Sequence, residues 1–209
     1  MRKERPVSNR RAELLELAAR MFAERGYGQT TVRDIADAAG ILSGSLYHHF
    51  DSKESMVDEI LRTFLDELFT RYREIVDAGL EPKQTLKALV VASFEAIDSR
   101  HAAVAIYQNE SKHLMPLERF SYLEDRSVEF RKLWTVLLED GMGAGVFRAD
   151  LDVDLAYRFI RDTVWVAVRW YRPDGGLSAE TVADQYLAIL LDGIATARQP
   201  KRKPARPKK

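Results

Sequence analysis

Apolar residues recur along almost the whole chain with the spacing of an amphipathic helix. In the first segment, Leu14, Leu17 and Met21 lie three or four residues apart, and the pattern stops at Gly26 and Gly28. This spacing places the apolar side chains on one helical face, and glycines commonly end helices. No alternating strand pattern and no internal repeat is visible. The pattern therefore predicts an all-α fold.

Polar capping residues mark where the next three helices begin. Thr31 and Asp34 have the capping-box spacing, which opens a short helix that stops at Gly40. The segment SGSLYHHF follows as a third helix, and a fourth begins shortly after it and runs through residue 68. The expected N-caps are Ser43 for the third helix and Asp51 or Ser52 for the fourth.

Prolines and glycines divide the rest of the chain into five further helices. Pro82 and Pro116 stand where a helix favours proline, at its start, and the glycines at 141, 143 and 145 are expected to end the longest of the five. The expected ranges are 82–99, 102–113, 116–140, 152–172 and 179–197.

The composition narrows the class of protein. The 209 residues are 46% hydrophobic, which suffices for one large or two small domains. The absence of cysteine excludes disulfides, zinc-thiolate sites, iron-sulfur clusters and cysteine nucleophiles, and it suits a reducing compartment. Charges interrupt the apolar runs near the start, so neither a signal peptide nor a transmembrane helix is predicted. We expect a cytoplasmic protein without a membrane partner.

Charge is unevenly distributed, although 32 basic and 32 acidic residues cancel formally. Residues 1–53 carry 9 basic and 7 acidic side chains, residues 54–197 carry 16 and 25, and residues 198–209 carry 7 and none. An acidic middle repels nucleic acid, so any DNA contact belongs to the ends. The Pro-rich basic tail is expected to be disordered. It either strengthens non-specific DNA binding or is a solvated end.

The second and third expected helices fit the helix-turn-helix pattern. Two helices cross closely when the residue at the crossing is small, the turn reaches positive φ, and an apolar residue of the second helix packs back onto the first. Ala36, Gly40 and Leu46 fill these three positions. The apolar face of the first helix would support the pair.

The third helix also carries the residue types that a DNA-reading helix needs. Short side chains at 43–45 let the backbone approach the major groove, and Tyr47 and His48 lie one turn further on, within reach of a phosphate or a base edge. Arg33 and Lys53 are candidate phosphate partners. Taken alone, SGSLYHHF could equally be an ordinary surface helix; its context favours DNA reading.

The stretch TTVRDIADAAGILSGSLYHHFDSKESM resembles the DNA-binding motif of the tetracycline-repressor (TetR) family. The resemblance implies an all-helical homodimer with an N-terminal three-helix domain that binds double-stranded operator DNA and a C-terminal domain that binds a small effector and releases DNA. We expect these domains over 1–52 and 53–198, followed by the tail at 199–209. The implied DNA contacts are Thr31, Arg33, Ser43, Gly44, Ser45, Tyr47, His48 and Lys53.

Later segments, including IYQNE, RFSYLEDR and LDVDLAYRFIRDTVWVAVRWYRP, are similar to actinobacterial members of this family that repress late cholesterol breakdown. The similarity extends to about residue 195. It implies a repressor whose effector is an acyl-CoA thioester of a partly degraded steroid. The alternative is a regulator of the same type that responds to a different hydrophobic small molecule without CoA.

The expected helix 152–172 carries an arginine on or beside its apolar face. Arg161 has Tyr157 and Trp165 at four residues' distance and no acidic residue at three or four. A buried, unpaired guanidinium costs several kcal/mol, so either another helix or a ligand supplies the anion. The resemblance favours the ligand, with Arg161 meeting a carbonyl, carboxylate or phosphate and Trp165 enclosing the ring portion.

Other aromatic residues could belong either to an effector pocket or to an ordinary core, and the sequence leaves both open. The residues concerned are Tyr107, Phe120, Tyr122, Phe130 and Trp134. The last two helices are expected to form the dimer interface, with an intramolecular core as the alternative. Their apolar face comprises Val182, Tyr186, Ile189, Leu190, Gly193 and Ile194.

Two other classes of protein fit the sequence less well. An enzyme is not expected, because adjacent His48 and His49 point about 100° apart and cannot chelate one metal together, and the glycines of GMGAG follow a helix rather than a strand. We therefore expect no catalytic residue, no metal and no cofactor. The second class is an architectural DNA-binding protein without an effector, for which about 150 residues would exceed what dimerisation needs.

Overall fold

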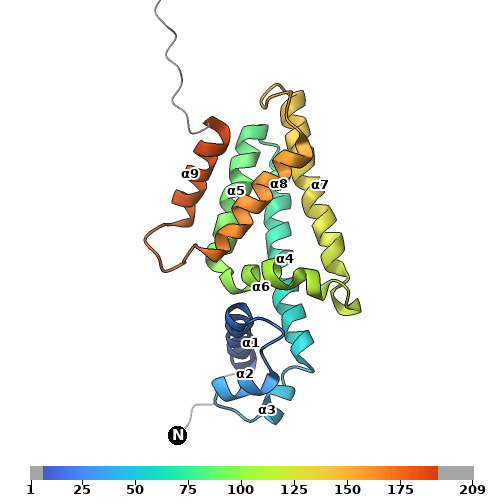
Figure 1. Cartoon of the computed structure of the whole chain (residues 1–209), viewed down its shortest axis with the longest axis vertical. Coiled ribbons are helices and arrows are strands. Elements are labelled where there is room, and N and C mark those ends of the chain that lie inside the picture. The colour runs from blue at the N-terminus through green and yellow to red at the C-terminus, as the bar shows by residue number, and fades with distance from the viewer. Residues whose placement is uncertain (1–6, 193–209) are drawn as a thin grey trace, which may run out of the picture.

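The computed structural model describes residues 7–192, which contain helices and no strand. Figure 1 shows α1, α2 and α3 at one end of the molecule, α4 running away from them, and the later helices packed around the far part of α4. The predicted all-α fold is confirmed. The α-helices are α1 (Val7–Arg25), α2 (Val32–Ala38), α3 (Ser43–Tyr47), α4 (Lys53–Asp77), α5 (Pro82–Ser99), α6 (His101–Leu114), α7 (Tyr122–Gly143), α8 (Val153–Val166) and α9 (Ala179–Asp192), with short 3-10 helices η1 (Glu118–Phe120) and η2 (Ala167–Arg169).

The turn between α2 and α3 has the geometry that the sequence predicts. Gly40 adopts a φ of 66°, a conformation that side chains beyond glycine rarely take. The amide of Ile41 then donates to the carbonyl oxygen of Ala36 at 3.0 Å, which closes the turn. Ala36 and Leu46 are fully buried where the two helices meet. The short helices are thus held at a fixed angle on α1.

Helix α4 joins the two ends of the molecule. Ser52 caps it by accepting from the amide of Ser55 at 3.1 Å, and the helix continues unbroken for 25 residues. Near its start, Glu59 accepts two hydrogen bonds from Arg11 of α1, one of them at 2.6 Å, and the Arg11 guanidinium lies 4.5 Å from the Phe50 ring centroid. The end of the molecule that carries α1, α2 and α3 is therefore fastened directly to α4.

Two helix starts differ from the expected ones. Leu42, and not Ser43, is the N-cap of α3. The helix expected from Pro116 begins instead at Tyr122, because the intervening residues form η1, which carries the fully buried Phe120 into the core.

The end of α7 also differs. The helix continues past Gly141, whose missing side chain makes room for the ring of Phe147; a Cβ there would lie 2.1 Å from that ring. The chain turns at Gly145, with a φ of 70°. Throughout residues 7–192, the apolar stretches of the helices are too short or too charged to cross a bilayer.

Candidate DNA-reading surface and effector cavity

Helix α3 presents its predicted contact residues to solvent at the end of the molecule opposite α5 to α9 (Figure 1). Gly44, Ser45, Tyr47 and His48 are exposed, whereas Leu46 packs inward. The Tyr47 side chain is 54% exposed. The surface therefore combines small residues with a phenol and an imidazole, as a helix that approaches a groove requires.

Helix α2 contributes two further predicted contacts. The hydroxyl of Thr31 accepts from the amide of Asp34 at 3.1 Å, and the Asp34 carboxylate accepts from the amide of Thr31 at 2.8 Å, so the predicted capping box is present. The Thr31 hydroxyl also donates to the Asp34 carboxylate at 2.6 Å, and this hydrogen bond, followed by the one from the Thr31 amide, lowers the pKa of Asp34. Arg33 has an 85% exposed side chain and lies 3.8 Å from Asp37. Such an exposed pair is weak, which leaves Arg33 available to a phosphate.

Lys53 is engaged within the fold. Its Nζ donates to the carbonyl oxygen of Tyr27 at 2.9 Å and lies 4.2 Å from the Tyr27 ring centroid. The phenol of Tyr27 donates to Glu54 at 2.8 Å. Burial and this hydrogen bond raise the pKa of Tyr27. Lys53 thus fastens the start of α4 to the loop after α1, a role that the sequence did not predict.

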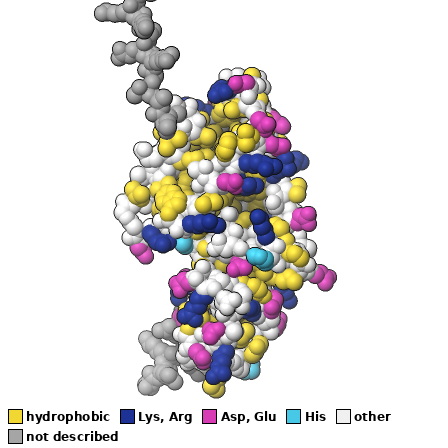
Figure 2. All heavy atoms as spheres, viewed as in Figure 1, with side chains coloured by type: hydrophobic (Ala, Val, Ile, Leu, Met, Phe, Trp, Pro, Cys, Tyr) yellow, Lys and Arg dark blue, Asp and Glu magenta, His cyan; other side chains and the backbone are white. Residues whose placement is uncertain are grey.

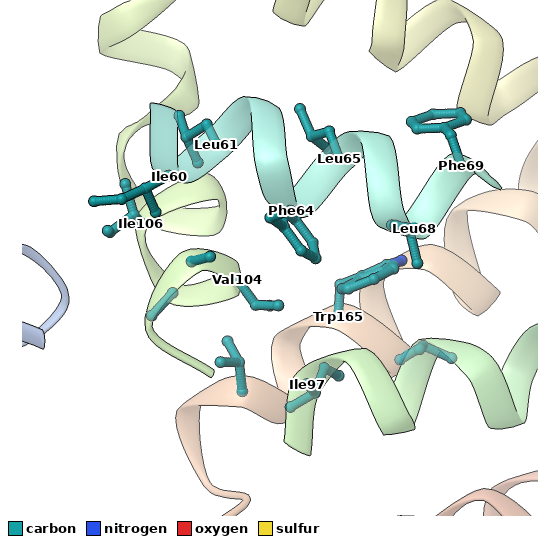
Figure 3. Close-up of a cluster of buried hydrophobic side chains, with 14 of the residues drawn as sticks. Ile60, Leu61, Phe64, Leu65, Leu68, Phe69, Ile97, Val104, Ile106 and Trp165 are labelled. Atoms are coloured by element: carbon teal, nitrogen blue, oxygen red, sulfur yellow. The ribbon is translucent and has the colours of Figure 1, made fainter. Parts of the chain in front are cut away.

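A second candidate site lies in the C-terminal helices. A cavity of about 60 Å³ is enclosed by α4, α6, α7 and α8. Figure 3 shows Trp165 lying against Phe64 and Leu68 of α4. Four of the seven residues predicted to bind the effector meet here. The lining comprises Phe64, Leu65, Leu68, Phe69, Tyr107, Gln108, Arg126, Ser127, Phe130, Tyr157, Arg161 and Trp165.

The aromatic rings of the cavity contact one another edge to face. The centroid of Trp165 lies 6.3 Å from that of Phe64 and 6.0 Å from that of Phe130, while Phe64 lies 6.4 Å from Tyr107. Rings in this arrangement favour flat apolar groups as neighbours. Burial raises the pKa of Tyr107, so its phenol is neutral.

The other three predicted effector residues lie outside this cavity. Phe120 is fully buried in η1. The ring of Tyr122 lies 3.8 Å from the Arg62 guanidinium. Trp134 is buried against Tyr72, with 6.1 Å between ring centroids. The structure thus places Phe120 and Trp134 in the surrounding core and Tyr122, half-buried, against its edge.

Arg161 is not the buried, unpaired guanidinium that the sequence indicates. Its side chain is 43% exposed at the rim of the cavity, and its Nε donates to Asp162, the next residue, at 2.7 Å. The guanidinium also lies 5.5 Å from the Tyr157 ring centroid. No acidic residue lies three or four positions away, as the sequence shows, but at the helix surface the long side chain bends back to its immediate neighbour Asp162.

A second arginine lines the cavity and was missed. Arg126 of α7 donates to Asp66 at 2.7 Å and to Glu129 at 2.9 Å, and it lies 5.1 Å from the Phe69 ring centroid. It stands four residues before Phe130 on α7, so both face the same way. This spacing was a signal that could have found it. Held by two carboxylates, Arg126 is less free than Arg161.

A larger groove lies between the two ends of the molecule. Its volume is about 530 Å³, and it is bounded by α1, α4 and the corner between α5 and α6. Charged side chains such as Arg20, Asp98 and Arg100 line it, and it is open to solvent. Phe64 lines both this groove and the small cavity. The buried Phe64 ring of α4 is therefore part of the wall of both hollows.

Helices α8 and α9 leave apolar side chains uncovered. Phe159 of α8 is 63% exposed and Ile189 of α9 is 55% exposed, with Leu190 next to Ile189 in α9; Trp170, which directly follows η2, is 56% exposed. Figure 2 shows hydrophobic side chains gathered over this part of the molecule.

Part of the expected dimer face packs inside instead. Val182 is buried and the ring of Tyr186 lies 6.2 Å from that of Phe94 in α5. Gly193 and Ile194, which were also assigned to the interface, lie outside the described residues.

Comparisons with known proteins agree on one family. Residues 14–60 match the family model described as bacterial regulatory proteins of the tetR family, and residues 79–194 match the one described as a tetracyclin repressor-like C-terminal domain.

Two curated relatives carry the name HTH-type transcriptional repressor KstR2. The one from Rhodococcus jostii is 67% identical, covering 90% of this chain and 93% of that protein. The one from Mycobacterium tuberculosis strain H37Rv is 64% identical, covering 90% and 94%. Among solved structures, the ketosteroid transcriptional regulator KstR2 of Mycobacterium tuberculosis matches with a TM-score of 0.87 and 63% identity, covering 91% and 97% of the chains. These relatives are transcriptional repressors, not enzymes.

Proposed function

The chain belongs to the TetR family of transcriptional regulators, and from this premise we propose that it is a homodimeric repressor of steroid-catabolic genes. In this proposal an acyl-CoA thioester of a steroid degradation intermediate releases the protein from operator DNA. The observation that carries the effector assignment is the cavity where Arg161 stands at the rim of an aromatic lining that includes Trp165 and Phe130. The names of the relatives support the steroid class.

The cavity suits a ligand with a ring portion and a carbonyl or anionic end. Its walls are mostly aromatic and aliphatic, which favours apolar rings. Arg161 can turn to a ligand at low cost, because its present partner Asp162 is an exposed neighbour and such pairs contribute little to stability. Arg126 would have to give up its ion pairs with both Asp66 and Glu129 to bind a ligand. We therefore assign ligand capture to Arg161.

Effector binding must enlarge the cavity. Ligand pockets have volumes of about 300 to 1,000 Å³, against about 60 Å³ here. Close-packed side chains have to move to admit a ring system. Four of the lining residues belong to α4, the helix that begins at the DNA-reading end. A ligand that displaces them thereby changes the position of α3 relative to DNA.

Exposed apolar residues of α8 and α9 support a homodimer. Phe159, Trp170 and Ile189 are exposed apolar side chains, and each costs free energy while it contacts water. A two-fold axis beside α8 and α9 would bring the same residues of both copies together. Two reading heads at a fixed spacing then match two half-sites of the operator.

The proposal is tested by releasing the protein from its own upstream DNA. Steroid-derived acyl-CoA thioesters are titrated into the complex, with free CoA as the control, and release is followed by fluorescence anisotropy. We expect release by a thioester and none by CoA. Arg161→Met and Trp165→Leu should each weaken release at least tenfold, because they remove the rim cation and a cavity wall. Arg158→Met, an exposed arginine on the same helix, is the matched control.

A second candidate is an effector without CoA. Both cavity arginines already face carboxylates, so the cavity rim offers no excess positive charge to CoA phosphates. The matching free steroid acid distinguishes the two candidates. Release by the free acid at the same concentration as the thioester would favour an effector without CoA. If neither the acid nor the thioester releases the protein, only the DNA-binding assignment remains.

A further inference from the structure

One apolar side chain stands exposed at the start of α3. Leu42 is 81% exposed, more than any other large hydrophobic residue whose burial is described. Its neighbour Ile41 packs against the core. The backbone thus turns one apolar side chain inward and the next outward, at the end of the molecule that carries the DNA-reading helix.

Leu42 also occupies a position where leucine is unfavourable. It is the N-cap of α3, with φ −73° and ψ 144°, and its side chain makes no capping hydrogen bond. Within residues 7–192, four other helices are capped by side chains, namely by Thr31, Ser52, Asp152 and Ser178. Ser, Thr, Asp and Asn are preferred at this position because their oxygens accept a free helix amide. Leucine leaves that amide without a side-chain partner.

Both features cost free energy in the unbound chain. The exposed side chain keeps apolar surface in water, and the missing cap weakens a helix of only five residues. Neither cost is offset by a contact inside residues 7–192, because Leu42 does not pack against the core. A contact made only in a bound state would offset both costs.

We propose that Leu42 is a specificity-determining residue that contacts the C5-methyl group of a thymine in the major groove of the operator. This inference rests on the proposed function of the chain as an operator-binding repressor. The first residues of a reading helix lie nearest the base edges. The thymine methyl is the apolar group that a base edge presents in this groove. Gly44 and Ser45, both small and exposed, permit the close approach.

The surroundings of Leu42 favour a single methyl group over a protein partner. The residues that follow it are Ser43, Gly44 and Ser45, so the apolar surface does not extend along the helix. Protein docking surfaces are contiguous apolar patches of several hundred Å². The segment from residue 40 to residue 50 also contains no acidic side chain that would repel phosphates.

Leu42→Ser should affect the stability of the free protein and its affinity for the operator in opposite directions. The change gives α3 the same Ser-x-x-Ser sequence that caps α4 through Ser52 and Ser55. We expect the melting temperature to rise by about 2 to 4 °C, while the affinity for the operator falls. Leu117→Ser is the matched control, because Leu117 is an exposed leucine at the uncapped N-cap of η1. It should leave DNA affinity unchanged.

The methyl contact itself is tested with modified DNA. An operator duplex is selected from random DNA by the wild-type chain, and each thymine in turn is replaced by deoxyuridine, which lacks only the C5-methyl. We expect one symmetry-related pair of positions at which the wild-type chain binds about fourfold more weakly per half-site, the factor for one buried methyl group. Leu42→Ser and Leu42→Ala should lose this sensitivity, and Leu117→Ser should keep it.

Two results would overturn the inference. Either no thymine position is sensitive in the wild-type chain, or the sensitivity persists in Leu42→Ser. Leu42→Ala guards against an effect of the new cap, because alanine removes the side chain without adding a hydroxyl. A chain that selects no sequence from the random pool would instead refute the proposed function, and this inference with it.

Discussion

Tyr47 is half-exposed on α3, and its phenol makes no hydrogen bond within residues 7–192. We predict that Tyr47→Phe leaves the melting temperature unchanged, because nothing in the described fold depends on the hydroxyl. Affinity for DNA should fall about tenfold, as expected for loss of a hydrogen bond to a charged acceptor worth about 1.5 kcal/mol. Binding of wild-type and variant chains is compared by fluorescence anisotropy.

The same experiment on unrelated DNA distinguishes a phosphate contact from a base contact. A phosphate contact carries no sequence information. Tyr47→Phe should therefore lower the affinity for operator DNA and for random DNA by the same factor. Leu42→Ser should lower the affinity for operator DNA only. If Tyr47→Phe acts on the operator alone, the phenol contacts a base and its assignment changes.

Single residues show where sequence reasoning succeeds and where it stops. Ala36, Gly40 and Leu46 could be predicted, because a tight helix crossing imposes size and φ at fixed spacings. The partners of Lys53 and Arg161 could not. Tyr27 lies 26 residues before Lys53, so their contact is set by tertiary packing. The side chain of Arg161 binds Asp162, the next residue, and helical periodicity does not favour contacts between adjacent residues.

Helices α8 and α9 form the proposed dimer interface, and a charge placed there should break the dimer. Phe159→Glu places a charge on the exposed apolar face of α8, and in a two-fold dimer the charge would meet its own copy. We expect the protein to sediment as a monomer of 23.9 kDa, where the wild-type chain sediments at roughly twice that mass. Analytical ultracentrifugation measures both.

Val128→Glu is the control for this experiment. Val128 is also apolar and exposed, but it lies on α7, outside the proposed interface. The variant should remain a dimer. If Phe159→Glu dimerises as the wild-type chain does, the interface lies elsewhere and the exposed face of α8 needs another explanation.

The helices themselves could largely be predicted from their boundary signals. Helix α5 has the bounds that Pro82 and the apolar pattern indicate. Helix α7 was predicted six residues too early, because a proline permits a helix start but does not require one. The short 3-10 turn that replaces its first residues depends on burying Phe120. Tertiary packing of this kind leaves no periodic signal in the sequence.

At the level of the whole molecule, the proposal predicts reciprocal binding. If an effector weakens operator binding by some factor, operator DNA must weaken effector binding by the same factor. We expect isothermal titration calorimetry to give a higher effector Kd with saturating operator than without it. The ratio should equal the loss of DNA affinity measured with saturating effector.

An effector Kd that saturating operator leaves unchanged would contradict the proposal, because an effector that releases the protein from DNA must bind the DNA complex more weakly. Random DNA is the control, because it binds without engaging both reading heads. It should raise the effector Kd less than the operator does.

In the proposed function, helix α4 is a rigid connection between the cavity and the DNA. Phe64 lies eleven residues after Lys53 on an unbroken helix, which corresponds to about 17 Å at the usual rise per residue. A tilt of about 5° at Phe64 would move the start of α4 by roughly 1.5 Å, and opposite movements in two copies would change the distance between reading heads by roughly 3 Å. That is about the length of a hydrogen bond. A rotation too small to disturb the core can therefore misalign the α3 helices of both copies with the major grooves that they contact.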